Sequence, residues 1–144
     1  MKDTKNNYWG CQMLTRTTPA LAPELEAVVT RTIGCAIRVH QALGPGFHEA
    51  IYQDALGVEL EWEGLPFQRE FQVSMSYRGR ALRTQRLDLV VDRLVVVELK
   101  AVERLDRVHQ TQLLSYMKAA KLPVGLLMNF HAEFLKSQLR RFVL

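Results

Sequence analysis

The chain has 144 residues, of which 48% are hydrophobic and 24% charged, and its formal net charge of +4 is typical of one soluble globular domain. Its longest apolar runs are far too short to cross a bilayer, and the stretch MKDTKNNYWGCQM lacks the apolar core of a signal peptide, so we expect a cytoplasmic protein without membrane association. Two cysteines, Cys11 and Cys35, exclude a disulfide framework and a cysteine-rich zinc site.

The first half of the chain reads as a tail followed by two helices. Residues 1–22 are polar and have no sustained period, which predicts a flexible N-terminal tail. From Glu24, apolar residues recur at helical spacing until the GPG at 44–46 ends the helix. A second helix is expected in FHEAIYQDALGVELEWEG, ending near Gly64.

The second half alternates strands with one further helix. PFQREFQVSMSYRG alternates as a strand and turns at Gly79, and two more strands follow at about 84–91 and 94–100. VHQTQLLSYMKAAKL is an amphipathic helix, PVGLLMNF is a short buried strand, and EFLKSQLRRFVL adds a strand or a helix. This order predicts an α/β fold in which helices flank a central mixed sheet.

The largely apolar run RLDLVVDRLVVVELK carries Asp88, Glu98 and Lys100 among its leucines and valines. Glu98 and Lys100 are two residues apart on a strand, so their side chains point to one face. A two-residue turn before that strand would leave Asp88 and Glu98 on opposite faces. A three-residue loop centred on Arg93, or a one-residue bulge, would bring Asp88 beside Glu98.

The chemistry of these residues has two interpretations. Two converging carboxylates suit Mg²⁺ or Mn²⁺, which would activate a water molecule, while the ammonium of Lys100 would orient that water or stabilise developing charge. The alternative is a buried Asp–Lys or Glu–Lys ion pair with a structural role.

Several motifs resemble a known family. Asp88, nine residues and then ELK at 98–100 resemble the signature of the PD-(D/E)XK nuclease superfamily, and GFHEAIY at 46–52 resembles the motif of the GxxExxY protein family. The similarity continues through IGCAIRVHQALGPG, HQTQLLSYMKA and VGLLMNF and covers roughly residues 24–142. It implies a single PD-(D/E)XK, restriction-endonuclease-like domain over residues 23–144.

The resemblance also implies a site. Asp88 and Glu98 match the metal-binding carboxylates, Lys100 matches the signature lysine, and Glu49 matches a helix glutamate that completes the metal ligands. Gln112 and Tyr116 match the Q-x(3)-Y feature of RecB-like nucleases and share one face of a helix. Residues 83–85 and Leu87 differ from the family's usual residues, without touching the acidic set.

The function implied by the resemblance is divalent-metal-dependent hydrolysis of phosphodiester bonds, with Mg²⁺ or Mn²⁺ as cofactor. DNA is expected ahead of RNA as the substrate, and a protein partner or a homodimer stays open. The alternative is a nuclease-like module that binds nucleic acid or a protein without cutting. Arginines 78, 80, 83 and 86 crowd one hairpin and fit either a solvated face or a surface for a phosphate backbone.

Overall fold

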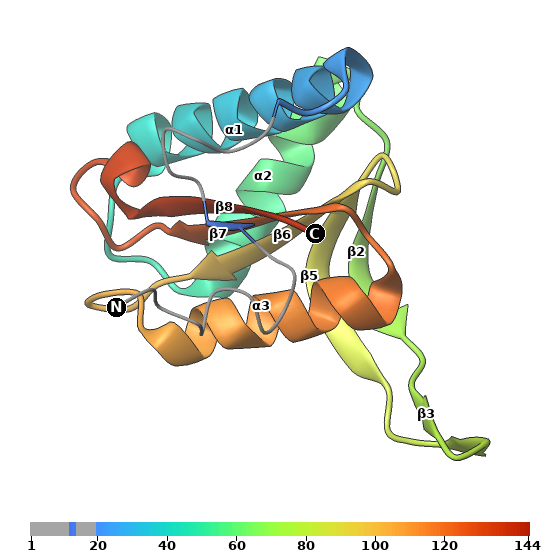
Figure 1. Ribbon diagram of the computed structural model, residues 1–144. Helices are drawn as coiled ribbons and strands as arrows, with labels where there is room; N and C mark the ends of the chain where they lie inside the picture. Colours follow the sequence, from blue (N-terminus) through green and yellow to red (C-terminus); the bar gives the residue numbers. More distant parts are fainter. Residues whose placement is uncertain (1–11, 14–19) are drawn as a thin grey trace, which may run out of the picture.

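The structure, a computed structural model, describes residues 12–13 and 20–144, and it has a central sheet with helices on both faces (Figure 1). Most of the tail predicted over residues 1–22 lies outside the described residues. Within them, β1 (Gln12–Met13) pairs antiparallel with the last strand, β8 (Leu139–Val143). The predicted fold class, a mixed α/β sheet flanked by helices, is confirmed.

Two helices cover one face of the sheet (Figure 1). The first, α1 (Pro23–Leu43), begins with a proline and ends at Gly44, whose φ is +69°. The second, α2 (Glu49–Glu63), ends at Gly64 in the left-handed conformation, where the Gly64 N–H donates to the carbonyls of the last turn. Both helices lie where the apolar periodicity predicts them.

The link between these helices is fixed by one buried tyrosine. The hydroxyl of Tyr52 donates to the carbonyl of Gly44 at 2.6 Å and accepts from the N–H of Phe47 at 3.2 Å. Its ring stacks on Phe130, with centroids 4.6 Å apart. Tyr52 therefore determines where α2 begins, and with it the position of Glu49.

The sheet has the strand order β1-β8-β7-β6-β5-β2. Only β6 and β7 pair in parallel, and the other neighbours are antiparallel. The helix α3 crosses between β6 and β7 on the face opposite α1 and α2, and the short 3₁₀ helix η2 precedes β8 (Figure 1). The bounds of these elements are β2 (Phe67–Val73), β5 (Gln85–Val91), β6 (Val95–Lys100), α3 (Arg107–Ala120), β7 (Val124–Asn129) and η2 (Leu135–Gln138).

A separate small hairpin lies between β2 and β5, where the alternation predicts one strand running to Gly79. It consists of β3 (Ser76–Tyr77) and β4 (Arg80–Ala81), and it projects away from the sheet (Figure 1). Arg78 and Gly79 have φ of +50° and +77°, as a two-residue hairpin turn requires. The predicted turn is therefore present, but it belongs to this hairpin.

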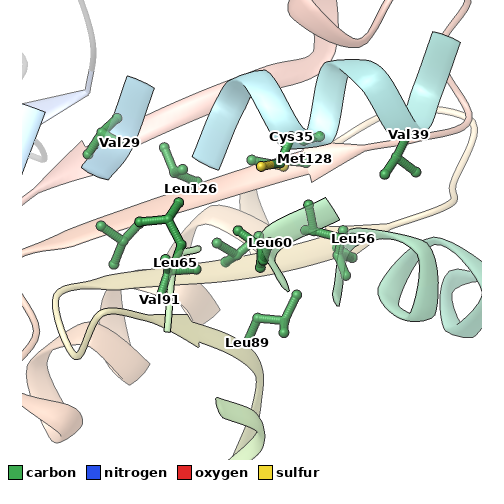
Figure 2. Packing of buried hydrophobic residues seen from close by; sticks show 14 of the residues in the cluster. Val29, Cys35, Val39, Leu56, Leu60, Leu65, Leu89, Val91, Leu126 and Met128 are labelled. Atoms are coloured by element: carbon green, nitrogen blue, oxygen red, sulfur yellow. The ribbon is translucent and has the colours of Figure 1, made fainter. Parts of the chain in front are cut away.

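Two apolar clusters hold the layers together. The larger lies between α1, α2 and the sheet (Figure 2) and includes Val29, Cys35, Val39, Leu56, Leu60, Leu65, Leu89, Val91, Leu126 and Met128. The smaller packs Leu113 and Met117 of α3 against the other face. The approach of α3 is close because Gly125 lacks a side chain: a Cβ there would lie 2.5 Å from Sδ of Met117.

Across the described ranges, no helix combines the length and the apolar character needed to span a membrane.

Candidate active site

The β5–β6 hairpin has the register that the acidic pair requires. Val91 pairs with Val95, so three residues connect the strands, and Leu89 pairs with Val97. Asp92 and Arg93 have φ of +51° and +55° and form the turn. Continuing this register by one residue sets Asp88 opposite Glu98.

The two strands part at this point, and each carboxylate accepts a hydrogen bond from the main chain. The N–H of Leu99 donates to Oδ2 of Asp88 at 2.9 Å, and the N–H of Asp88 donates to Oε1 of Glu98 at 3.2 Å. Side-chain oxygens thus take the donors that strand pairing would otherwise satisfy. Each carboxylate is anchored through one of its oxygens.

The convergence does not arise from strict strand alternation. Leu87 packs in the cluster on the α3 side of the sheet, whereas Leu89 packs in the cluster under α1 and α2. The alternation along β5 is therefore interrupted at Asp88. In the β2–β5 register the residue opposite is Glu70, whose φ of +51° is unusual for a non-glycine residue in a strand.

Burial and like charge act together on this pair. Glu98 is only 7% exposed, and burial, with the neighbouring charge of Asp88, raises its pKa to about 8. Burial is also the largest cause of the raised pKa of Asp88, and the hydrogen bond from Leu99 opposes it. A cation beside the pair would favour the charged form of both groups.

One cation lies on the same strand. Lys100 is two residues beyond Glu98, at the end of β6, and is partly buried. Its positive charge lowers the pKa of both Asp88 and Glu98 without reversing the rise that burial causes. The site is therefore one buried acid, Glu98, and one partly buried acid, Asp88, with one nearby ammonium.

Glu49 reaches this cluster from the first turn of α2. Its side chain is exposed, and Oε1 accepts a hydrogen bond from the N–H of Ala101 at 3.3 Å. Its charge contributes to the raised pKa of both Asp88 and Glu98, so the carboxylate lies beside them. Over the described part of the chain, no three His, Cys, Asp or Glu side chains are grouped closely enough to hold one ion, so Glu49 lies at the rim.

Gln112 and Tyr116 approach the pair from α3. Nε2 of Gln112 donates to the hydroxyl of Tyr116 at 2.8 Å, and that hydroxyl donates to Oε1 of Gln85 at 3.3 Å. Burial is the main cause of the raised pKa of Tyr116; the hydrogen bond from Gln112 lowers it, and the charges of Glu98 and Asp88 raise it further. The two side chains thus form one edge of the cluster.

Two further residues that lie beside Asp88, Gln53 and Glu70, were not predicted from the sequence as part of the site. Nε2 of Gln53 donates to the carbonyl of Asp88 at 2.9 Å and to Oε1 of Glu70 at 3.3 Å. Gln53 follows Glu49 by four residues, so their shared helix face could have indicated it. Glu70 could not be found in this way, because its proximity depends on the β2–β5 register.

His109 lies one turn before Gln112 in α3. Its Nδ1 accepts the N–H of Asp106 at 3.0 Å, which caps the first turn of α3. The position of His109 is thus explained by helix capping.

The donor set fits a hard divalent cation. Asp88 and Glu98 supply oxygen ligands of the kind that Mg²⁺ and Mn²⁺ prefer, and Mg²⁺ is commonly bound by one or two carboxylates plus water. Burial is the main cause of the raised pKa of both groups, neighbouring carboxylates add to it, and a bound cation would offset the rise.

Comparison with known proteins identifies the family. The model of the PD-(D/E)XK nuclease superfamily matches residues 26–142, a span that contains β5, β6, α2 and α3. No curated protein and no solved structure shows a significant match. Because the family model covers most of the chain, the protein belongs to the PD-(D/E)XK nuclease superfamily.

Proposed function

We propose that this protein is a divalent-metal-dependent nuclease that hydrolyses phosphodiester bonds of nucleic acid. One observation carries the proposal: the carboxylates of the partly buried Asp88 and the buried Glu98 converge at the fork between β5 and β6, with Lys100 on the same strand as Glu98. Nucleases of this superfamily generally use divalent metals. A structural ion pair alone would not need a second buried carboxylate with a raised pKa.

Each residue has a distinct role in this proposal. Asp88 and Glu98 would hold Mg²⁺ or Mn²⁺, which when bound supplies an activated water molecule and stabilises charge on a phosphoryl oxygen. Lys100 orients the water or stabilises developing negative charge. Glu49 adds a third carboxylate at the rim. Gln112 and Tyr116 line the edge, where Gln112 donates to the hydroxyl of Tyr116 and that hydroxyl donates to Gln85.

We also propose the finer assignment to the GxxExxY proteins. Three motif positions in the loop and first turn of α2 have separate physical tasks. Gly46 has φ of +113°, which favours glycine. Glu49 faces the acidic pair, and Tyr52 fixes the start of α2 through its buried hydroxyl. These tasks explain why the three residue types occur at this spacing.

The test is cleavage of labelled single- and double-stranded DNA and RNA by purified protein with Mg²⁺, Mn²⁺ or EDTA. Activity is expected with metal and absent with EDTA, with DNA cut more efficiently than RNA. Asp88→Ala, Glu98→Ala and Lys100→Ala should each lower it by about 10²–10³ or more. Retention of Mn²⁺ by calorimetry without cleavage of any substrate would favour the module that binds without cutting.

A further inference from the structure

The positive charge of the chain is concentrated in one segment. Residues 71–87, which contain the β3–β4 hairpin, hold four arginines and no acidic residue. Their net charge therefore equals that of the whole chain, +4, and the remaining residues are neutral in sum. Such a segment produces a local positive field rather than a uniformly basic surface.

Three of these arginines lie in or beside the hairpin and form no salt bridge with any residue that the structure describes. Arg78, Arg80 and Arg83 are exposed, and none has a carboxylate within salt-bridge distance in the described ranges. Arg86, at the base, lies 3.6 Å from Glu70. Like charges this close repel one another, so the hairpin favours a polyanionic ligand.

An aromatic ring lies among these charges. Tyr77 is 66% exposed and pairs across the hairpin with Arg80. Leu82, beside the hairpin, is also exposed. An exposed aromatic ring among arginines suits the unpaired bases of a single strand, because stacking requires a base face that a duplex hides.

The hairpin is continuous with the candidate active site. Gln85, the first residue of β5, accepts the hydrogen bond from Tyr116, and Asp88 is three residues further along. Arg83 is five positions before Asp88 in the chain, a span of at most about 17 Å if the chain is extended. The hairpin projects from the body at this edge of the sheet (Figure 1).

We propose that the β3–β4 hairpin is a binding arm that holds single-stranded nucleic acid next to the cleavage site. Arg78, Arg80 and Arg83 contact successive phosphates, and Tyr77 stacks on an unpaired base. The proposal rests on the proposed nuclease function for the identity of the polymer, but it concerns binding and not the chemical step.

The experiment measures binding in EDTA, so that nothing is cut. Fluorescence anisotropy would compare a 20-nucleotide DNA strand, the matching RNA strand and the DNA duplex. The arm variant, Arg78→Gln/Arg80→Gln/Arg83→Gln, should bind the strand at least tenfold more weakly. The slope of log affinity against log salt should fall by about 2, because three phosphate contacts are lost.

A matched control removes the same charge elsewhere. Arg93→Gln/Lys121→Gln/Lys136→Gln lowers the net charge by three at exposed positions outside the hairpin and should retain most of the affinity. Tyr77→Ala should weaken binding on the order of tenfold, whereas Tyr77→Phe, which keeps the ring, should not. The wild type should bind the single strands more tightly than the duplex. Comparison of its affinities for the DNA strand and the RNA strand shows which polymer it prefers.

Three outcomes would overturn the proposal of a binding arm. In the first, the arm variant binds as the wild type does; in the second, the charge control loses as much affinity as the arm variant. In the third, the duplex binds as tightly as the strand and Tyr77→Ala has no effect. Hydrolysis of a small phosphodiester reporter with Mn²⁺ separates this failure from that of the proposed function. The arm variant should retain that hydrolysis, and Asp88→Ala should lose it.

Discussion

The main-chain N–H of Asp88 donates to Oε1 of Glu98 at 3.2 Å, so the backbone of one acidic residue holds the side chain of the other. The carboxylate of Asp88 is held in turn by the N–H of Leu99. The fold therefore keeps two acids together before any ion is bound. The repulsion and desolvation of that pair lower the stability of the protein without metal, as is common at functional sites.

The stability of the metal-free protein should fall as the pH rises. The pKa of Glu98 is raised to about 8 from an ordinary value of 4.5, so the folded state binds more protons than the unfolded state between these values. The contribution of protonated Glu98 to the free energy of unfolding is fully present below pH 4.5 and is lost as the pH rises through 8. Glu98→Gln, which cannot ionise, should raise the free energy of unfolding at pH 8.5 by about 2–4 kcal/mol.

Urea denaturation in EDTA between pH 5 and 9 measures this effect. The difference between Glu98→Gln and the wild type should grow as the pH rises. Glu103→Gln, at an exposed position three residues beyond Lys100, is the control and should change stability by less than about 0.5 kcal/mol. A difference that is the same at pH 5 and pH 8.5 would contradict the raised pKa of Glu98.

Metal binding should release a proton near neutral pH. Because Glu98 must be charged to bind an ion, the apparent affinity for Mn²⁺ should rise about tenfold per pH unit below pH 8. Calorimetry in two buffers of different ionisation enthalpy should show about one proton released per ion at pH 7. Asp88→Ala and Glu98→Ala should weaken Mn²⁺ binding, and Lys100→Ala should spare it. Equal heats in the two buffers would argue against a protonated Glu98.

The three central residues should fail in cleavage for different reasons. In the proposed mechanism, Asp88→Ala and Glu98→Ala each remove a metal ligand, whereas Lys100→Ala removes only a positive charge near the attacked phosphate. Each should lower the cleavage rate by about 10²–10³ or more while the protein stays folded. Saturating Mn²⁺ should not rescue Lys100→Ala. Circular dichroism would check the fold, and full activity in any of these variants would remove that residue from the proposed mechanism.

Two tyrosines should respond differently to loss of the hydroxyl. Tyr116→Phe breaks the contacts with Gln112 and Gln85 at the edge of the site, so cleavage should slow several-fold with little change in stability. Tyr52→Phe leaves the N–H of Phe47 without its partner and should lower stability by about 1–2 kcal/mol. The variants would be compared by cleavage rate and by urea denaturation. If Tyr52→Phe instead slowed cleavage and Tyr116→Phe lowered stability, the roles assigned to the two hydroxyls would have to be exchanged.

Replacement of two glycines by alanine should change the stability of the protein in opposite directions. Gly125→Ala would set a Cβ 2.5 Å from Sδ of Met117 and 3.1 Å from Leu113, so these two side chains of α3 must move, and stability should fall by about 1–3 kcal/mol. At Gly34, within α1, the nearest atom to a new Cβ is 3.5 Å away. Gly34→Ala should therefore stabilise by about 0.5–1 kcal/mol. Thermal denaturation of both variants checks this; stabilisation by Gly125→Ala would mean that α3 packs less closely.

Much of the fold could be predicted from local pattern. Helical spacing indicates α1, α2 and α3, and the apolar runs indicate β5, β6 and β7. The division between β2 and the β3–β4 hairpin could not be predicted, because alternation is similar in a strand that continues and in one that stops. What ends β2 is its pairing with β5, which extends only from Val73–Gln85 to Phe67–Val91.

The candidate site shows the same division. The spacing of Asp88 and Glu98 leaves two hairpin registers open, and the three-residue connection between the paired Val91 and Val95 decides between them. The contacts of Gln53 and Glu70 follow from tertiary packing of α2 and β2 on β5. No periodic pattern in one sequence carries that information, since each contact joins segments distant along the chain.

The exposed hairpin also has a consequence for proteolysis. Arg78, Arg80 and Arg83 are trypsin cleavage points in a projecting turn, the kind of segment that proteases nick first. A cut there would leave β2 and β5 paired over six residue pairs, so the two fragments should stay associated as one folded body. The folded body would retain both apolar clusters. Protection of the hairpin from trypsin would indicate that a polyanion covers it, and cleavage would indicate that it is uncovered.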